Sequence, residues 1–261
     1  MDMTRWNGMR FLGIGLMLAA LVACSIPFKG EREVAAESEA EFQKMKNTMP
    51  VSGDVRVRSY VYCIADAIIA ELDEPYRSLD WDIEIFDNDA VNAFAMPGGK
   101  IGVFTGILKV AENPDQLGAV IGHEVAHVTE QHAVERYNQA MTTQVGASTV
   151  GIFGSIALGG DVTGLTQMAA EVALTLPYGR GQESEADTVG LVYSANAGFD
   201  PRQSVILWKN MAEANKGAPP EFLSTHPSSD TRIQDLIAEL PTALTDYNNA
   251  RAAGKSPECA P

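Results

Sequence analysis

The chain has 261 residues, of which 46% are hydrophobic and 20% are charged. These proportions are those of an ordinary globular protein, so the chain can bury the core of one domain or of two small ones. Its formal net charge is −15 at pH 7, and so acidic a surface repels both nucleic acid and anionic bilayers. The composition therefore excludes a disordered chain and argues against DNA or RNA as a partner.

Residues 1–23 have the layout of a secretory signal peptide. Arg5 and Arg10 precede an apolar run over residues 11–23 that is too short to span a bilayer comfortably. The run ends in Leu-Val-Ala before Cys24, which resembles the lipobox of bacterial lipoproteins, where the signal is cut before a cysteine that becomes lipidated. A plain signal peptide and a short anchor helix are the alternatives. Removal of residues 1–23 makes the formal charge one unit more negative than −15, that is −16.

A lipid on Cys24 predicts where the mature chain resides. Acyl chains at this position would attach the protein to a membrane on its periplasmic side without any transmembrane helix. Ser25, which follows the cysteine, favours the outer membrane over the inner one by analogy with sorting in enteric bacteria. We expect residues 24–52 to hold the lipidated cysteine, a charged and alanine-rich tether, and an exposed helix.

The folded domain is expected to start near residue 53. An amphipathic helix is predicted up to Leu72, because large apolar residues recur there at helical spacing. A strand follows over residues 81–86, where apolar and polar residues alternate. Residues 91–104 are interpreted as two short strands joined by a Pro-Gly-Gly turn. They form either a simple hairpin or, in the functional interpretation, a ledge at Asn92, Ala93 and Phe94 on which an extended substrate pairs.

The helix that begins after Asn113 carries the strongest chemical signal. Asn113 can cap this helix, and Pro114 suits its first turn. His123 and His127 lie four residues apart, so that both imidazoles face one metal ion while Glu124 reaches a water on that metal. The sequence therefore predicts a zinc peptidase site that needs a third ligand.

Two neighbouring features are given no part in this site. His132 lies five residues beyond His127 and off the ridge that the two ligands share on a continuous helix, so we interpret it as a surface or packing residue. Residues 145–176 are rich in glycine, alanine and small apolar side chains. They predict closely packed buried helices, with a membrane-touching or lid-like segment as the alternative.

The third ligand is expected in a later helix that opens at Glu183. A carboxylate there would complete a set of two histidines and one glutamate, which leaves a fourth position for water, as in catalytic rather than structural zinc sites. Asp187 lies one turn further on and can accept the free ring N–H of a ligand histidine. A loop with His226 then leads into a last helix that is expected to end at Leu240, followed by a loosely ordered tail over residues 241–261.

Two further cysteines, Cys63 and Cys259, allow two interpretations. In an oxidising periplasm they can form a disulfide that ties the tail to an early helix. Alternatively, Cys63 is a buried thiol within the apolar pattern of its helix. The sequence gives no distance between the two sulfurs.

Taken in order, these motifs resemble the M48 family of zinc metallopeptidases, in its periplasmic lipoprotein branch. The resemblance covers residues 53–240 and implies an α+β fold, mainly helical and zincin-like, with a small β-sheet or hairpin next to the active-site helix. It implies one Zn²⁺ per chain bound by His123, His127 and Glu183, with Glu124 as general base and Asp187 orienting a ligand. His226 and Arg232 match family positions that stabilise the oxyanion or cover the metal.

The function that follows is a zinc endopeptidase of the bacterial cell envelope that acts on unfolded or misassembled proteins. Its partners would be such polypeptides as substrates, the membrane through Cys24, and no nucleic acid. A zinc-bound chaperone or assembly lipoprotein with little proteolysis is the main alternative. A structural lipoprotein with a coincidental motif is the third. The sequence leaves the oligomeric state open.

Overall fold

The computed structural model describes residues 28–142, 178–214, 221–226 and 230–260. The elements within them are α2 (Glu31–Thr48), α3 (Val55–Ile69), η1 (Tyr76–Ser78), β1 (Asp82–Phe86), β2 (Ala93–Met96), β3 (Lys100–Phe104), η2 (Thr105–Lys109), α4 (Pro114–Thr129), α7 (Arg180–Asn196), α8 (Arg202–Ala214), α9 (Glu221–Thr225) and α10 (Asp230–Ala252). Residues 132–142 are also helical. The predictions for Cys24 and for residues 145–176 lie outside the described residues. None of the described helices is long and apolar enough to cross a membrane.

The three strands form a small mixed sheet in the order β1-β3-β2. β1 runs parallel to β3, and β2 runs antiparallel to it. The predicted strand and hairpin are confirmed, as is the mainly helical fold with a small sheet beside the motif helix. Because β3 is central, β2 lies at an edge of the sheet, and this edge strand contacts α4.

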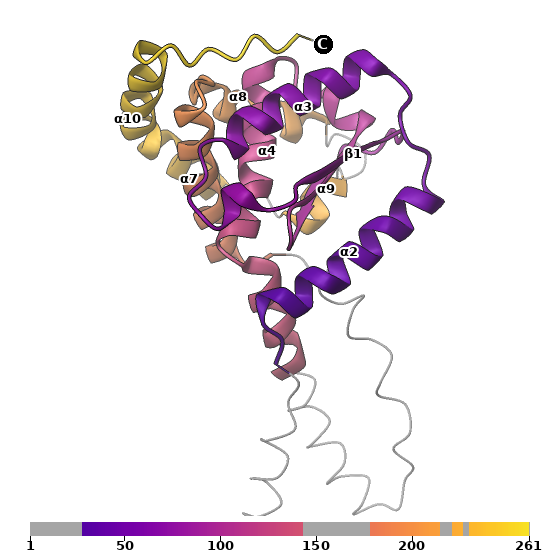
Figure 1. Cartoon of the computed structure of the whole chain (residues 1–261). Coiled ribbons are helices and arrows are strands. Elements are labelled where there is room, and N and C mark those ends of the chain that lie inside the picture. The colour runs from indigo at the N-terminus through magenta and orange to yellow at the C-terminus, as the bar shows by residue number, and fades with distance from the viewer. Residues whose placement is uncertain (1–27, 143–177, 215–220, 227–229, 261) are drawn as a thin grey trace, which may run out of the picture.

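α4 is the central helix of the fold (Figure 1). The Asn113 side chain caps it as predicted, because its oxygen accepts a hydrogen bond from the Gln116 N–H at 3.0 Å. α3, α7 and α8 all pack against α4, and its side chains are buried almost without interruption from Gln116 to Val128. A helix enclosed in this way is a rigid base for metal ligands.

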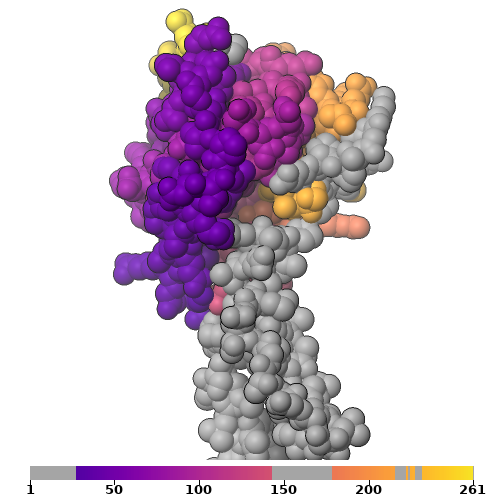
Figure 2. All heavy atoms as spheres, turned by 90° about the vertical axis from the view of Figure 1, so that its right-hand side faces the viewer, coloured from indigo at the N-terminus to yellow at the C-terminus, as the bar shows by residue number. Residues whose placement is uncertain are grey.

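α2 packs against the sheet more closely than an exposed helix would. Its Phe42 is fully buried and meets the rings of Phe86 and Phe94 at centroid distances of 6.2 and 6.4 Å. Ion pairs flank this contact, such as Lys46 with Asp82 at 2.9 Å. The indigo atoms of these N-terminal residues form a continuous band along one face of the molecule (Figure 2). The charged composition of the helix describes only its outer face.

The expected end of the last helix at Leu240 is wrong. α10 continues through Pro241 to Ala252, because Ala243 and Ala250 bury their side chains on the far side of the proline and that burial offsets its missing N–H donor. The tail beyond the helix is tied down as well, since Cys259 forms a disulfide with Cys63 of α3 at a Cα–Cα distance of 5.6 Å.

Candidate metal centre

Four side chains from three separate segments meet at one point. They are His123 and His127 of α4, Glu183 of α7, and His226, which follows α9. One nitrogen or carboxylate oxygen of each lies within 4.8 Å of the others, and all four residues are buried. The structure thus brings the three predicted ligands together and adds His226 to them.

The distances within this cluster suit a tetrahedral metal ion. Zinc bonds of about 2.0–2.1 Å at tetrahedral angles place neighbouring ligand atoms about 3.3 Å apart. His127 Nε2 lies 3.1 Å from His123 Nε2 and 3.5 Å from Glu183 Oε1, and His123 Nε2 lies 3.7 Å from Glu183 Oε2. Imidazole nitrogen and carboxylate oxygen are also donors that zinc prefers. The residues present therefore fit zinc.

The protonation states of His127 and Glu183 also favour a cation. Burial lowers the pKa of His127 well below its usual value, so this imidazole is neutral and free to bind a metal. Burial acts to raise the pKa of Glu183, but hydrogen bonds with His127 and His226 and the charge of His123 lower it more strongly. An ionised carboxylate beside a neutral imidazole is the state that metal binding requires.

Glu124 lies beside the ligands without belonging to the cluster. Its Oε2 accepts a hydrogen bond from the Ala95 N–H of β2 at 3.1 Å. Its Oε1 lies 3.4 Å from His226 Nε2. Burial raises the pKa of this carboxyl group, which makes it a better proton acceptor than an exposed glutamate.

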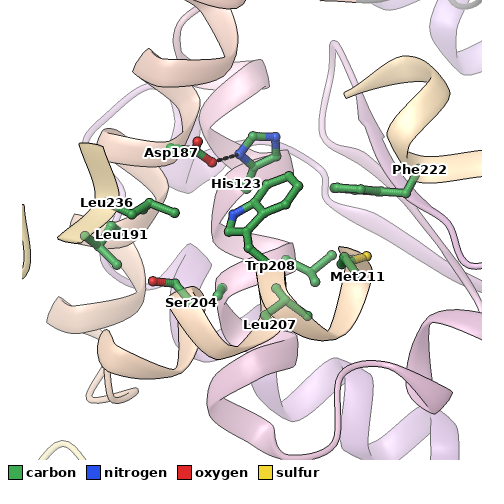
Figure 3. Close-up of a pocket in the computed structure, with 11 residues that line it drawn as sticks. His123, Asp187, Leu191, Ser204, Leu207, Trp208, Met211, Phe222 and Leu236 are labelled. Carbon is green, nitrogen blue, oxygen red and sulfur yellow. Dashed lines mark ion pairs between the residues drawn. The ribbon is translucent and has the colours of Figure 1, made fainter. Parts of the chain in front are cut away.

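His123 is supported from behind by a buried ion pair. Its Nδ1 lies 3.0 Å from Asp187 Oδ1 (Figure 3). Arg232 of α10 donates hydrogen bonds to both oxygens of Asp187, at 2.6 and 2.8 Å, and also contacts Glu183. Asp187 is thus placed to accept the Nδ1–H of His123 and so to orient this ligand. Arg232 was expected to stabilise the oxyanion or to cover the metal, and in the structure it is paired with the carboxylates of Asp187 and Glu183.

His127 contacts two residues, His132 and Tyr178, that sequence reasoning did not assign to the site. Its Nδ1 lies 2.9 Å from His132 Nδ1, and His132 Nε2 lies 3.2 Å from Glu185 Oε2. The Tyr178 ring stacks on the His127 ring at 3.7 Å and an interplanar angle of 19°. The Arg136 guanidinium carbon in turn lies 3.5 Å from the centroid of the Tyr178 ring. The only sequence signal for His132 was a histidine close after a predicted ligand.

His226 closes the front of the cluster. Its Nδ1 lies 3.2 Å from His123 Nε2 and 3.0 Å from Glu183 Oε1, which is where a fourth ligand would lie. The Phe222 ring stacks on His226 at 4.4 Å. The backbone N–H of Phe222 donates to the Val91 carbonyl at 3.1 Å, so the α9 segment is fastened to the chain just before β2.

The predicted ledge lies at the sheet edge beside these residues. Asn92 and Ala93 are buried, and β2 contacts α4. The Phe94 side chain points to the opposite face of the sheet, where it meets Phe42 of α2. None of these three side chains is exposed.

A small apolar cavity lies behind His123. Its lining includes Leu191, Trp208, Met211 and Phe222, with the Trp208 indole beside the His123 ring (Figure 3). These side chains come from α7, α8 and α9. The metal centre thus has a polar side, at Asp187, and an apolar side.

This arrangement is that of a metallopeptidase. It combines two buried histidines of a His-Glu-x-x-His motif, a glutamate on the neighbouring helix, and an edge strand beside them. The family model named Peptidase family M48 matches residues 56–240. This match covers more than half of the chain, and the chain belongs to that family.

Individual relatives agree with this assignment. The mitochondrial metalloendopeptidase OMA1 of Schizosaccharomyces pombe is 38% identical over 167 residues, which are 63% of this chain and 48% of that protein. The human metalloendopeptidase OMA1 is 33% identical over 218 residues, 80% of this chain and 42% of that protein. The beta-barrel assembly-enhancing protease of Escherichia coli is 26% identical over 201 residues, 74% and 41% of the two chains. The chain spans less than half the length of each of these relatives.

Proposed function

We propose that the chain is a zinc-dependent endopeptidase of the bacterial cell envelope that hydrolyses unfolded or misassembled proteins. The observation that carries this proposal is the buried cluster of His123, His127 and Glu183 with Glu124 beside it. A bound zinc ion would supply Lewis acidity, which lowers the pKa of water and polarises a peptide carbonyl.

Glu124 is the general base of this proposal. The Ala95 N–H fixes one of its oxygens, so the other faces the cluster and can take the proton of the attacking water. The same carboxyl group then delivers that proton to the leaving amine. A raised pKa suits both steps, because the group must accept and release a proton in one cycle.

His226 is placed either to stabilise the developing oxyanion or to cover the metal position in a closed form, because its ring lies within reach of both Glu124 and the ligand cluster. Arg232 supports the site through Asp187 and Glu183. The β2 backbone at Asn92, Ala93 and Phe94 would pair with an extended substrate segment, which favours unfolded over folded clients.

The cellular setting is part of the proposal. The signal-like residues 1–23 and Cys24 support export and lipid anchoring in the periplasm, with the outer membrane favoured. Similarity to a beta-barrel assembly-enhancing protease supports a role in protein quality control there. A Cys24→Ser variant is expected to appear in the soluble fraction after lysis; membrane association of that variant would contradict the anchor.

The test of the reaction is cleavage of unfolded casein by the wild type and by Glu124→Gln. Glutamine keeps an oxygen that can accept the Ala95 N–H but cannot take a proton, so the rate should fall on the order of 10²–10⁴-fold. Zinc content should be near one per chain in both proteins. Equal cleavage by the two proteins, or no cleavage by zinc-loaded wild type, would refute the peptidase assignment.

The position of His226 favours a second candidate, a zinc-bound chaperone or assembly factor that rarely cleaves. In the structure its ring fills the place where a substrate carbonyl or water would bind. In that case the wild type and the Glu124→Gln variant would suppress aggregation of an unfolded client equally well, and neither would cleave it.

A further inference from the structure

His127 has a supporting chain of its own, separate from the one behind His123. We propose that His132 is a positioning residue that holds ligand His127 in place, with Glu185 as the outer end of the same hydrogen-bonded chain. The inference rests on the proposed function, since it concerns a ligand of the metal centre.

The geometry of the chain is continuous from the metal position to the surface. His127 presents Nε2 to the cluster, 3.1 Å from His123 Nε2, and turns Nδ1 toward His132 Nδ1 at 2.9 Å. His132 Nε2 reaches Glu185 Oε2 at 3.2 Å. The two histidines are each 1% exposed, whereas the Glu185 side chain is 56% exposed.

Hydrogen positions along this chain follow from the ligand role. An imidazole that binds a metal through Nε2 carries its hydrogen on Nδ1. The Nδ1–H of His127 therefore donates to His132 Nδ1, which must be unprotonated. His132 then carries its hydrogen on Nε2 and donates it to Glu185. Every donor faces one acceptor, and only this arrangement of tautomers satisfies all three groups.

The backbone is bent to bring His132 to this place. α4 ends at Thr129, and Gln131 adopts a φ of 57°, a left-handed conformation that residues other than glycine rarely take. The chain thereby turns before the helix over residues 132–142 begins. On a continuous helix His132 would lie off the ligand ridge, but after this turn its ring faces His127.

The two ligand histidines are thus supported differently. His123 meets the carboxylate of Asp187 directly, at 3.0 Å, and that carboxylate is buried with Arg232. His127 meets an imidazole first and a carboxylate only at the surface. Because Glu185 is solvated, His132 rather than Glu185 should dominate the support of His127.

The test compares zinc affinity among variants of the full chain by competition with a chromophoric chelator. His132→Phe keeps a ring but removes the acceptor, and it should weaken zinc binding about 10–100-fold. His132→Asn places Oδ1 close to the former Nδ1, so it should restore affinity to within a few-fold of wild type. Glu185→Gln keeps an acceptor at the surface and should have little effect.

Ser194→Ala is the matched control for a lost buried hydrogen bond. Its hydroxyl is buried in α7 and donates to the Gly118 carbonyl of α4 at 2.9 Å, away from the ligands. This variant should bind zinc like the wild type. If His132→Phe binds zinc as tightly as the wild type, or if His132→Asn is as weak as His132→Phe, the positioning role is refuted.

A second measurement needs no variant. Nitrogen-15 NMR of the zinc-loaded wild type should show a hydrogen on His127 Nδ1 and on His132 Nε2, and none on His132 Nδ1. A hydrogen on His132 Nδ1 would overturn the inference while leaving the metal centre intact. Absence of zinc binding by the wild type would instead refute the proposed function, and this inference with it.

Discussion

Gly122 of α4 and Gly190 of α7 meet where the two helices cross. A Cβ atom on Gly190 would lie 2.6 Å from the His123 backbone nitrogen and 2.7 Å from the Gly122 carbonyl carbon. A Cβ atom on Gly122 would lie 2.6 Å from the Gly190 carbonyl oxygen. The absence of both side chains lets the helices approach closely, and this approach brings Glu183 of α7 to the two histidines of α4.

Gly190→Ala should therefore disturb both stability and metal binding. The added methyl group meets backbone on the rigid α4, so the helices must separate, at a cost of about 1–3 kcal/mol in the free energy of unfolding. The zinc affinity should fall as well, because Glu183 moves away from His123 and His127. Urea denaturation and chelator competition measure the two effects.

The matched control is Gly181→Ala in the same helix. A Cβ atom there has no neighbour within 4 Å, and alanine favours a helix over glycine by roughly 0.5–1 kcal/mol. This variant should be as stable as the wild type or more so, with unchanged zinc affinity. A Gly190→Ala variant that behaved like Gly181→Ala would show that the close crossing is not required.

His226→Ala tests whether the site is closed at rest. The substitution removes the ring that lies 3.2 Å from His123 Nε2 and opens the fourth position, so the initial rate of casein cleavage should rise several-fold. Zinc content must be measured in parallel, since one donor atom is lost. Phe222→Leu loosens the ring that stacks on His226 and should act in the same direction. A fall on the order of 10²–10³-fold would instead assign His226 to the oxyanion.

Local patterns predicted the parts of the site that depend on helical spacing. The relation of His123 to His127, and of Glu183 to Asp187, follows from residues one turn apart on a helix. The support of His127 by His132 did not follow, because it depends on one left-handed residue, Gln131, that ends the helix. Nothing in a periodic pattern marks such a residue when it is not glycine.

Contacts between distant segments were the other limit of prediction. Pro241 indicated a helix end, but burial of Ala243 and Ala250 in α10 carries the helix past it. The charges of α2 indicated an exposed helix, although one face buries Phe42 against the sheet. In both cases tertiary packing outweighs a local preference of the chain.

Acidification should release the metal. Burial acts to lower the pKa of His123, but the hydrogen bond and charge of Asp187, together with the charge of Glu183, raise it overall. Only the deprotonated imidazole binds zinc. Because the pKa of His123 is raised, protons compete with zinc for this imidazole at a higher pH than they would for an ordinary histidine. Zinc affinity should therefore be full at alkaline pH and fall as the pH drops through this pKa.

Asp187→Asn checks the cause of this pH dependence. Without the carboxylate the pKa of His123 falls, so the loss of zinc should begin at a lower pH than in the wild type. The affinity at alkaline pH should itself be weaker, since the orienting charge is gone. Chelator competition across a pH series separates the two effects. An onset that stays in place or moves to higher pH would contradict the role given to Asp187.

Removal of the disulfide should destabilise the fold without touching the metal centre. Cys63 and Cys259 are 196 residues apart in sequence, so the bond restricts most of the unfolded chain. Its removal typically costs about 2–5 kcal/mol in the free energy of unfolding. It also holds the tail where Lys255 pairs with Glu71 of the segment after α3, at 2.6 Å. The double variant Cys63→Ser/Cys259→Ser should lose this stability in urea denaturation and keep the zinc affinity of the wild type.

The reductant dithiothreitol supplies the control for that prediction. It should lower the midpoint of wild-type unfolding to that of the double variant and leave the double variant itself unchanged, because no other described cysteine remains to be reduced. If the chain is exported to the periplasm, as we propose, it should contain the bond, since that compartment is oxidising. Titration of free thiols should confirm that the bond has been reduced. If the reduced wild type then unfolds at the same urea concentration as the oxidised protein, the bond does not stabilise the domain. Packing of Ala243 and Ala250 would then suffice to hold α10 and the tail in place.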